Sequence, residues 1–134
     1  AEAVRVSGLG EWIGGSLAFV ANLPVIFMVI FIALLITFLT EIMSNTAIAT
    51  LMLPVLASVA KAVNVNPLIF MIPATISASC AFMLPSGTPP NAIVFGTGQI
   101  TLPQMAKTGF LLNFLGAAFL TLILYCLVFP LLGL

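Results

Sequence analysis

Charged side chains are almost absent from this sequence. They make up 4% of its 134 residues, whereas soluble domains carry about 25%. Three are acidic and three are basic. They are Glu2, Arg5, Glu11, Glu41, Lys61 and Lys107. So few charges exclude an ordinary water-facing surface, and without a basic patch we expect no nucleic-acid partner.

Residue types common in catalytic and metal sites are also scarce. The sequence has no histidine and only two cysteines. Cys80 and Cys126 both lie in apolar stretches and lack metal-ligand spacing, so we expect two free, buried thiols. No nucleophile–base pair or metal cluster can be recognised. This pattern indicates that the chain is not an enzyme and needs no cofactor.

The sequence is rich in apolar residues instead. It is 63% hydrophobic, with a mean hydropathy of +1.36. The charge-free segments are 12–40, 42–60, 62–106 and 108–134. Each reaches the roughly 18 residues that indicate a transmembrane candidate. The sequence therefore predicts an all-α integral membrane protein that crosses the lipid bilayer several times, in a plasma or bacterial inner membrane.

The first part of the chain predicts an arm and a hairpin. Residues 1–22 are predicted to form an interfacial amphipathic arm, because Trp12 and several aliphatic residues share one helical stripe. Residues 23–62 are predicted to form a re-entrant helical hairpin with Ser-Asn-Thr at its tip, 44–46. Its second arm, 47–60, would be about 21 Å long, which is shorter than a hydrocarbon core of about 30 Å.

The second part predicts two transmembrane segments. Residues 66–98 read as one helix broken near its middle, because the sequence PSGTPPN at 85–91 cannot lie inside a continuous helix. Residues 104–134 are predicted to form the C-terminal transmembrane helix, with an unbroken apolar run at 109–132.

Both polar breaks have the same design, in which a helix ends, small polar residues follow and another helix begins. Ser44 or Asn45 can cap the helix after the first break. Thr88 can cap the helix after the second, with Pro89 in its first turn. Free N–H groups at a helix start favour anions, and free carbonyl groups at a helix end favour small cations such as Na⁺. Secondary transporters build binding sites in this way, so the breaks predict an anion site beside a cation site.

A structural interpretation of the same residues stays open. Thr46 and Thr88 could bond to their own helices, and Asn45 and Asn91 could join neighbouring helices. The chain would then be a helical membrane module without a transport role. We expect Glu41 to support the hairpin tip by accepting hydrogen bonds, because a carboxylate would repel an anionic substrate.

Two stretches carry a family resemblance: SNT at 44–46 and SASCAFMLPSGTPPNAIVFG at 77–96. They resemble the divalent anion/sodium symporter family, which includes sodium-coupled dicarboxylate and citrate carriers. The resemblance implies an elevator-type homodimer with two inverted repeats in each protomer. Family members are several times longer than 134 residues. The chain would therefore be the C-terminal repeat only, and would work with an N-terminal half that carries another SNT hairpin.

The resemblance also implies roles for individual residues. Four would hold one Na⁺, through the carbonyl groups of Thr40, Met43 and Gly87 and the side chain of Asn45. Four would line the site for one substrate carboxylate: Asn45, Thr46, Thr88 and Pro89. Apart from the resemblance, we expect three residues to support the structure of the site: Ser44, Glu41 and Asn91.

The function predicted on this basis is symport of dicarboxylates such as succinate, or of related di- and tricarboxylates, with Na⁺ as the coupling ion. A related permease or exchanger that moves sulfate or another anion without Na⁺ is the alternative. Dependence of uptake on Na⁺ would distinguish the two.

Overall fold

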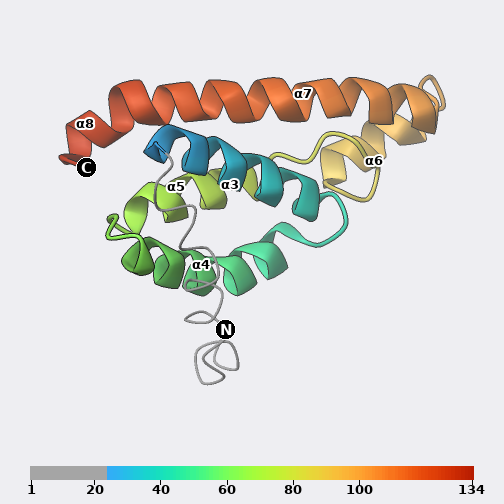
Figure 1. The fold of residues 1–134 in the computed structure, drawn as a ribbon. Coiled ribbons are helices and arrows are strands. Elements are labelled where there is room, and N and C mark those ends of the chain that lie inside the picture. Colours follow the sequence, from blue (N-terminus) through green and yellow to red (C-terminus); the bar gives the residue numbers. More distant parts are fainter. Residues whose placement is uncertain (1–23) are drawn as a thin grey trace.

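The computed structural model describes residues 24–134 and is drawn in Figure 1. These residues form helices joined by turns, and no strand occurs among them. The predicted all-α architecture is confirmed for this part of the chain. The predicted interfacial arm, 1–22, lies outside the described residues.

Helices α3 (Val25–Thr40) and α4 (Asn45–Ala62) form a helical hairpin. α3 starts after Pro24 and ends where the polar run TEIMSNT begins. Ser44 is the N-cap of α4, and its Oγ accepts a hydrogen bond from the N–H of Ala47 over 3.2 Å. Figure 1 shows the two helices running in opposite directions from this short turn.

α4 is longer than the sequence predicted. Its 18 residues span about 27 Å, against about 21 Å expected for 47–60. α4 and the stretch Leu102–Leu132 are both long and apolar enough to cross a membrane, with only 28% and 22% of their apolar windows buried inside the protein. Helix length therefore does not distinguish a re-entrant arm from a full span, and the re-entrant position of the hairpin stays a prediction.

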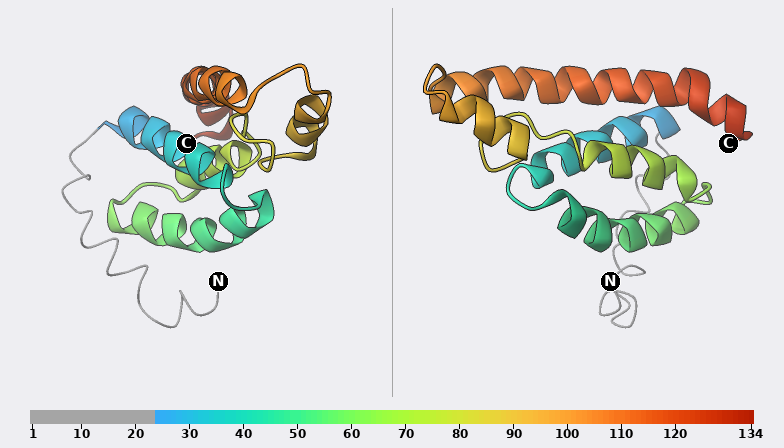
Figure 2. Two further views of the ribbon diagram at one scale, coloured as in Figure 1. Left: turned by 90° about the vertical axis from the view of Figure 1, so that its right-hand side faces the viewer. Right: turned by 180° about the vertical axis from the view of Figure 1, so that it is seen from behind.

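Helix α5 (Leu68–Ser77) packs against both arms of the hairpin. Figure 2 shows it beside α3 and above α4. Ile36, Ile48 and Phe70 come from these three helices and are each at most 2% exposed. This shared apolar core holds α5 so that its C-terminal end lies beside the hairpin tip.

The chain leaves helical geometry after Ser77 and resumes it in α6 (Pro89–Gly96). The intervening residues, 78–88, form turns and extended backbone around the sequence PSGTPPN. Every residue of α6 except Asn91 is exposed, and the helix projects from the others in Figure 2. α6 is therefore held mainly by the unwound segment that precedes it.

The last helical stretch begins two residues before the predicted start at 104. It consists of α7 (Leu102–Ile123), a π-helical turn η2 (Leu124–Val128) and α8 (Phe129–Leu132). Thr101 and Gln104 form a capping box, in which the N–H and the hydroxyl of Thr101 each donate to Gln104 Oε1 over 2.9 Å. This capping signal explains the earlier start.

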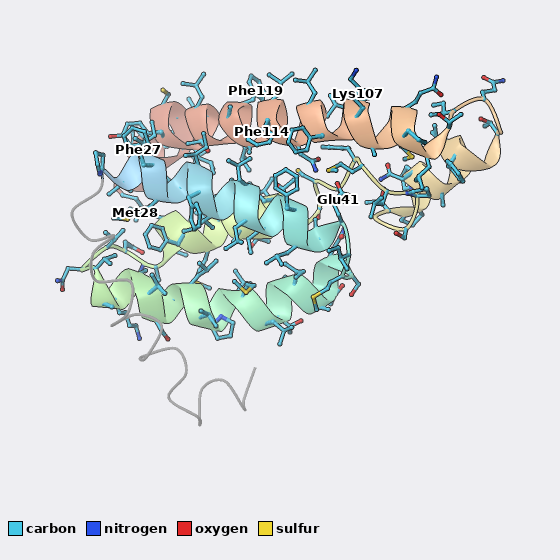
Figure 3. All side chains as sticks on the ribbon, turned by 45° about the vertical axis from the view of Figure 1, so that its right-hand side comes forward. Phe27, Met28, Glu41, Lys107, Phe114 and Phe119 are labelled. Atoms are coloured by element: carbon cyan, nitrogen blue, oxygen red, sulfur yellow. The ribbon has the colours of Figure 1, made fainter. Side chains whose placement is uncertain are left out.

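The two faces of α7 differ sharply. Its buried residues recur at every fourth position: Met105, Gly109, Asn113, Ala117 and Thr121. This face packs against α3. Beside it, the ring of Phe38 lies 5.7 Å from the rings of Phe110 and Phe114, which are partly exposed. The outer face carries large apolar side chains such as Phe119, which is 65% exposed and points away from the other helices in Figure 3.

Candidate functional site

The first break leaves carbonyl groups free of the helix that precedes it. The last helical hydrogen bonds of α3 are accepted by Leu39, from the N–H groups of Ile42 and Met43 over 3.2 Å. The carbonyl groups of Thr40 and Met43 follow this last acceptor. They lie where a helix end offers carbonyl oxygens to other partners.

Thr40 connects the hairpin tip to the end of α5. It is fully buried, and its Oγ1 lies 2.7 Å from the carbonyl oxygen of Ala78 and 2.8 Å from Oδ1 of Asn45. A hydroxyl carries one hydrogen, so Thr40 donates to only one of these oxygens. The other contact is relieved if the Asn45 amide turns by 180° and donates from its NH₂ group, or if a cation binds among the three oxygens.

Glu41 connects the first break to the second through hydrogen bonds. Its side chain is 4% exposed and accepts three hydrogen bonds from the backbone that follows α5. Oε1 accepts from the N–H groups of Phe82 at 2.7 Å and Met83 at 2.9 Å, and Oε2 accepts from that of Leu84 at 3.1 Å. Figure 3 shows Glu41 at the end of α3, beside this segment. The carboxylate thus supports the second break as well as the tip that carries it.

Asn91, in the first turn of α6, bonds back to the unwound segment that precedes this helix. Its Nδ2 donates to the carbonyl oxygens of Ala81 at 2.8 Å and Leu84 at 3.0 Å. Gly87 lies inside this loop, where an added Cβ would be 3.0 Å from the Cβ of Ala81 and 3.2 Å from Oε2 of Glu41. Gly87 therefore sits directly beside the carboxylate of the hairpin tip.

The last helix reaches the same place through two residues that were not predicted from the sequence. A Cβ on Gly109 would lie 2.3 Å from the carbonyl oxygen of Phe82 and 2.6 Å from the Cα of Met83. Glycine is thus required for this close approach. One turn later, Nδ2 of Asn113 donates to Oε1 of Glu41 over 2.9 Å. A lone amide in the final apolar run was the signal available, because such amides bond to groups inside a membrane protein.

The structure does not join all the predicted ligands. No hydrogen bond within residues 24–134 connects Thr46 or Thr88 across the two breaks. The carbonyl of Thr46 accepts from the hydroxyl of Thr50 in its own helix, and Thr88 makes no side-chain capping bond. Pro89 and Pro90 lack N–H groups, so the start of α6 offers an anion fewer donors than the start of α4.

The chemistry of the site is that of oxygen ligands. In the part of the chain that the structure describes, no group of three His, Cys, Asp or Glu residues could hold a metal ion. A hydroxyl, an amide and a carbonyl oxygen meet at Thr40, and the carboxylate of the next residue accepts from backbone N–H groups. Such oxygens suit hard cations, a class that includes Na⁺.

Comparison with known proteins decides the family. The profile described as the sodium:sulfate symporter transmembrane region matches residues 1–134. The chain belongs to this family. The resemblance to the divalent anion/sodium symporters is confirmed. Membership in a transporter family, together with the exposed apolar helices, indicates a membrane protein and points away from an enzyme.

Several members of the symporter family are close to this chain in sequence. The sodium-dependent dicarboxylate transporter SdcS of Staphylococcus saprophyticus is 49% identical over 133 residues, which cover 99% of this chain and 26% of that relative. The transporter of the same name from Staphylococcus aureus strain MRSA252 is 46% identical over the same shares. The chain thus spans about a quarter of the length of these relatives.

Proposed function

We propose that this chain is the C-terminal half of a sodium-coupled symporter for dicarboxylates such as succinate, or for related di- and tricarboxylates. The observation that carries the proposal is the junction of two helix breaks, made by Thr40 and Glu41. Discontinuous helices that meet in this way form the binding sites of secondary transporters. The names of the Staphylococcus relatives support both Na⁺ and a dicarboxylate.

Na⁺ binds at the end of α3, held by the carbonyl groups of Thr40, Met43 and Gly87 and by the side chain of Asn45. Two of these carbonyl groups follow the last helical acceptor of α3, and Gly87 lies beside Glu41. The Thr40 hydroxyl and the two oxygens beside it share one hydrogen, which also favours a nearby cation.

The substrate carboxylate binds across the two helix starts, to Asn45 and Thr46 on α4 and to Thr88 and Pro89 on α6. The start of α4 supplies free N–H groups and the positive end of a helix dipole. The negative charge of Glu41 opposes an anion until Na⁺ offsets it. Na⁺ therefore binds first and prepares the site for the anion.

This chain covers about a quarter of the length of its relatives, so the complete transporter contains further segments, and the family resemblance places an N-terminal half among them. That half carries the first SNT hairpin. Two complete multi-pass protomers form a homodimer in a plasma or bacterial inner membrane, and each works as an elevator. These features follow from the family resemblance, which also relates the two halves as inverted repeats.

Sulfate is the second candidate substrate, because the family description names it. Competition between sulfate and labelled succinate for uptake distinguishes these two candidate substrates. With labelled succinate near saturation, a tenfold excess of sulfate should leave uptake unchanged if the site is built for dicarboxylates, and should reduce it strongly if sulfate binds equally well or better.

The test uses a chimeric transporter, in which this chain replaces the matching segment of the Staphylococcus saprophyticus SdcS. Uptake of labelled succinate into proteoliposomes is measured with an inward Na⁺ gradient and with K⁺ in its place. We expect uptake only with Na⁺, and its loss in Asn45→Ala. Equal uptake in Na⁺ and K⁺ would favour an exchanger or uncoupled permease. Uptake that survives Asn45→Ala unchanged would support a packing role for the tip.

A further inference from the structure

We infer that Asn113, on the last helix, is a positioning residue that sets the Na⁺ affinity of the hairpin tip by holding the Glu41 carboxylate in place. The inference rests on the proposed function, because it concerns the affinity of that site for Na⁺. It adds α7 to the site, although every residue predicted from the sequence lies at one of the two breaks.

The hydrogen bonds around Glu41 give Asn113 a distinct place. Three of the four donors are consecutive backbone N–H groups, of Phe82, Met83 and Leu84. The fourth is the side-chain amide of Asn113, which donates to Oε1 over 2.9 Å. Backbone donors are fixed by the course of the unwound segment, whereas Asn113 approaches from a separate helix. Asn113 thus ties the orientation of the carboxylate to the position of α7.

The carboxylate belongs to the residue after one predicted Na⁺ ligand and lies beside another. Glu41 directly follows Thr40, and its Oε2 is 3.2 Å from the position of a Cβ on Gly87. All four donors to Glu41 are neutral groups, so its negative charge is not cancelled and acts on a cation bound nearby. A carboxylate that turns away would weaken this attraction.

Asn113 is poorly explained by packing alone. It is 1% exposed, and its Oδ1 has no hydrogen-bond partner. A buried oxygen without a partner lowers stability, and an apolar side chain of similar size would avoid this cost. The contact of Nδ2 with Glu41 is therefore what the asparagine provides. Gly109 makes the contact possible, because it brings α7 against the backbone of Phe82 one turn earlier.

The test compares Asn113→Leu with Thr121→Val in the chimeric transporter. Leucine keeps the branched shape and the number of heavy atoms and removes the amide donor. Thr121 lies on the same buried face two turns later, and its hydroxyl donates to the carbonyl of Ala117 in its own helix over 2.8 Å. Two quantities are measured: the Na⁺ concentration that gives half-maximal succinate uptake, and the rise of the melting temperature with Na⁺ relative to K⁺ in the absence of substrate.

We expect Asn113→Leu to raise the half-maximal Na⁺ concentration about tenfold, as for the loss of one hydrogen bond to a charged group. Thr121→Val should stay within about twofold, because only a bond within its own helix is lost. A purely structural Asn113 would lower the melting temperature equally at all Na⁺ concentrations and leave the half-maximal concentration unchanged. That result would overturn the inference.

Two further outcomes are distinguishable. If Asn113→Leu does not fold, Asn113→Ser replaces it, since its hydroxyl ends short of Glu41 and its smaller side chain cannot clash. The same tenfold rise is expected, and an unchanged half-maximal concentration overturns the inference. If the unaltered chimera shows neither Na⁺-driven uptake nor Na⁺-dependent stabilisation, the proposed function fails, and this inference fails with it.

Discussion

Replacing Gly109 by alanine tests whether α7 must touch the unwound segment. The added Cβ would lie 2.3 Å from the carbonyl oxygen of Phe82 and 2.6 Å from the Cα of Met83. Ordinary contact begins near 3.4 Å, so the two backbones must separate by about 1 Å (3.4 − 2.3). Both neighbours are backbone atoms that cannot move aside alone. Overpacking of this kind destabilises a protein by about 1–3 kcal/mol.

Gly116 provides a matched control on the same helix. A Cβ added there meets no atom within 4 Å. Gly116→Ala should be neutral or stabilise by up to about 1 kcal/mol, because alanine favours a helix more than glycine does. In the purified chimeric transporter, we expect a lower melting temperature for Gly109→Ala and an equal or higher one for Gly116→Ala.

The same displacement should disturb Na⁺ binding. A separation of about 1 Å would stretch the 2.9 Å bond between Asn113 and Glu41 beyond hydrogen-bonding distance. Gly109→Ala should therefore raise the half-maximal Na⁺ concentration for uptake, and Gly116→Ala should not. Identical melting temperatures and Na⁺ dependence in the two variants would contradict this prediction, because α7 would then not be in close contact with the unwound segment.

Three more predictions concern the two breaks. Glu41→Gln places an NH₂ group against backbone N–H donors. We therefore expect a loss of about 1–3 kcal/mol in stability and a higher half-maximal Na⁺ concentration for uptake. A melting curve and an Na⁺ titration like those of the unaltered protein would contradict this prediction. Gly87→Ala brings a Cβ to 3.0 Å from the Cβ of Ala81 and 3.2 Å from Oε2 of Glu41. These contacts are tight but side chains can shift, so uptake should persist with a several-fold higher half-maximal Na⁺ concentration. Complete loss of uptake would show that the site cannot adjust. Asn45→Ala should weaken Na⁺ and succinate binding together in separate titrations, and Na⁺ binding that survives intact would exclude a shared ligand.

The helical framework could be predicted because polar and proline-rich runs interrupt long apolar runs. TEIMSNT separates α3 from α4, and PSGTPPN separates α5 from α6. The residues at which the helices begin were harder to predict. The capping box of Thr101 and Gln104 starts α7 earlier than the apolar run indicates, and α4 starts at Asn45 because Ser44 caps it.

The contacts that assemble the site could not be read from spacing. Glu41 was expected to support its own tip, but its acceptor atoms bond to backbone groups about 40 residues later. Its fourth partner, Asn113, lies 72 residues away on another helix. Such pairs are fixed by how α3, α5 and α7 pack together. A buried carboxylate must find donors, but the sequence alone does not say which donors it finds.

We propose that the two breaks form one site in which Na⁺ and substrate bind together. The most direct test is the Na⁺ affinity of the purified chimeric transporter, measured with and without saturating succinate. Coupling between two ligands typically changes affinity about 5- to 150-fold, and equally for both. We predict that succinate tightens Na⁺ binding within this range and that Na⁺ tightens succinate binding by the same factor. An Na⁺ affinity that is unchanged by succinate would contradict the claim.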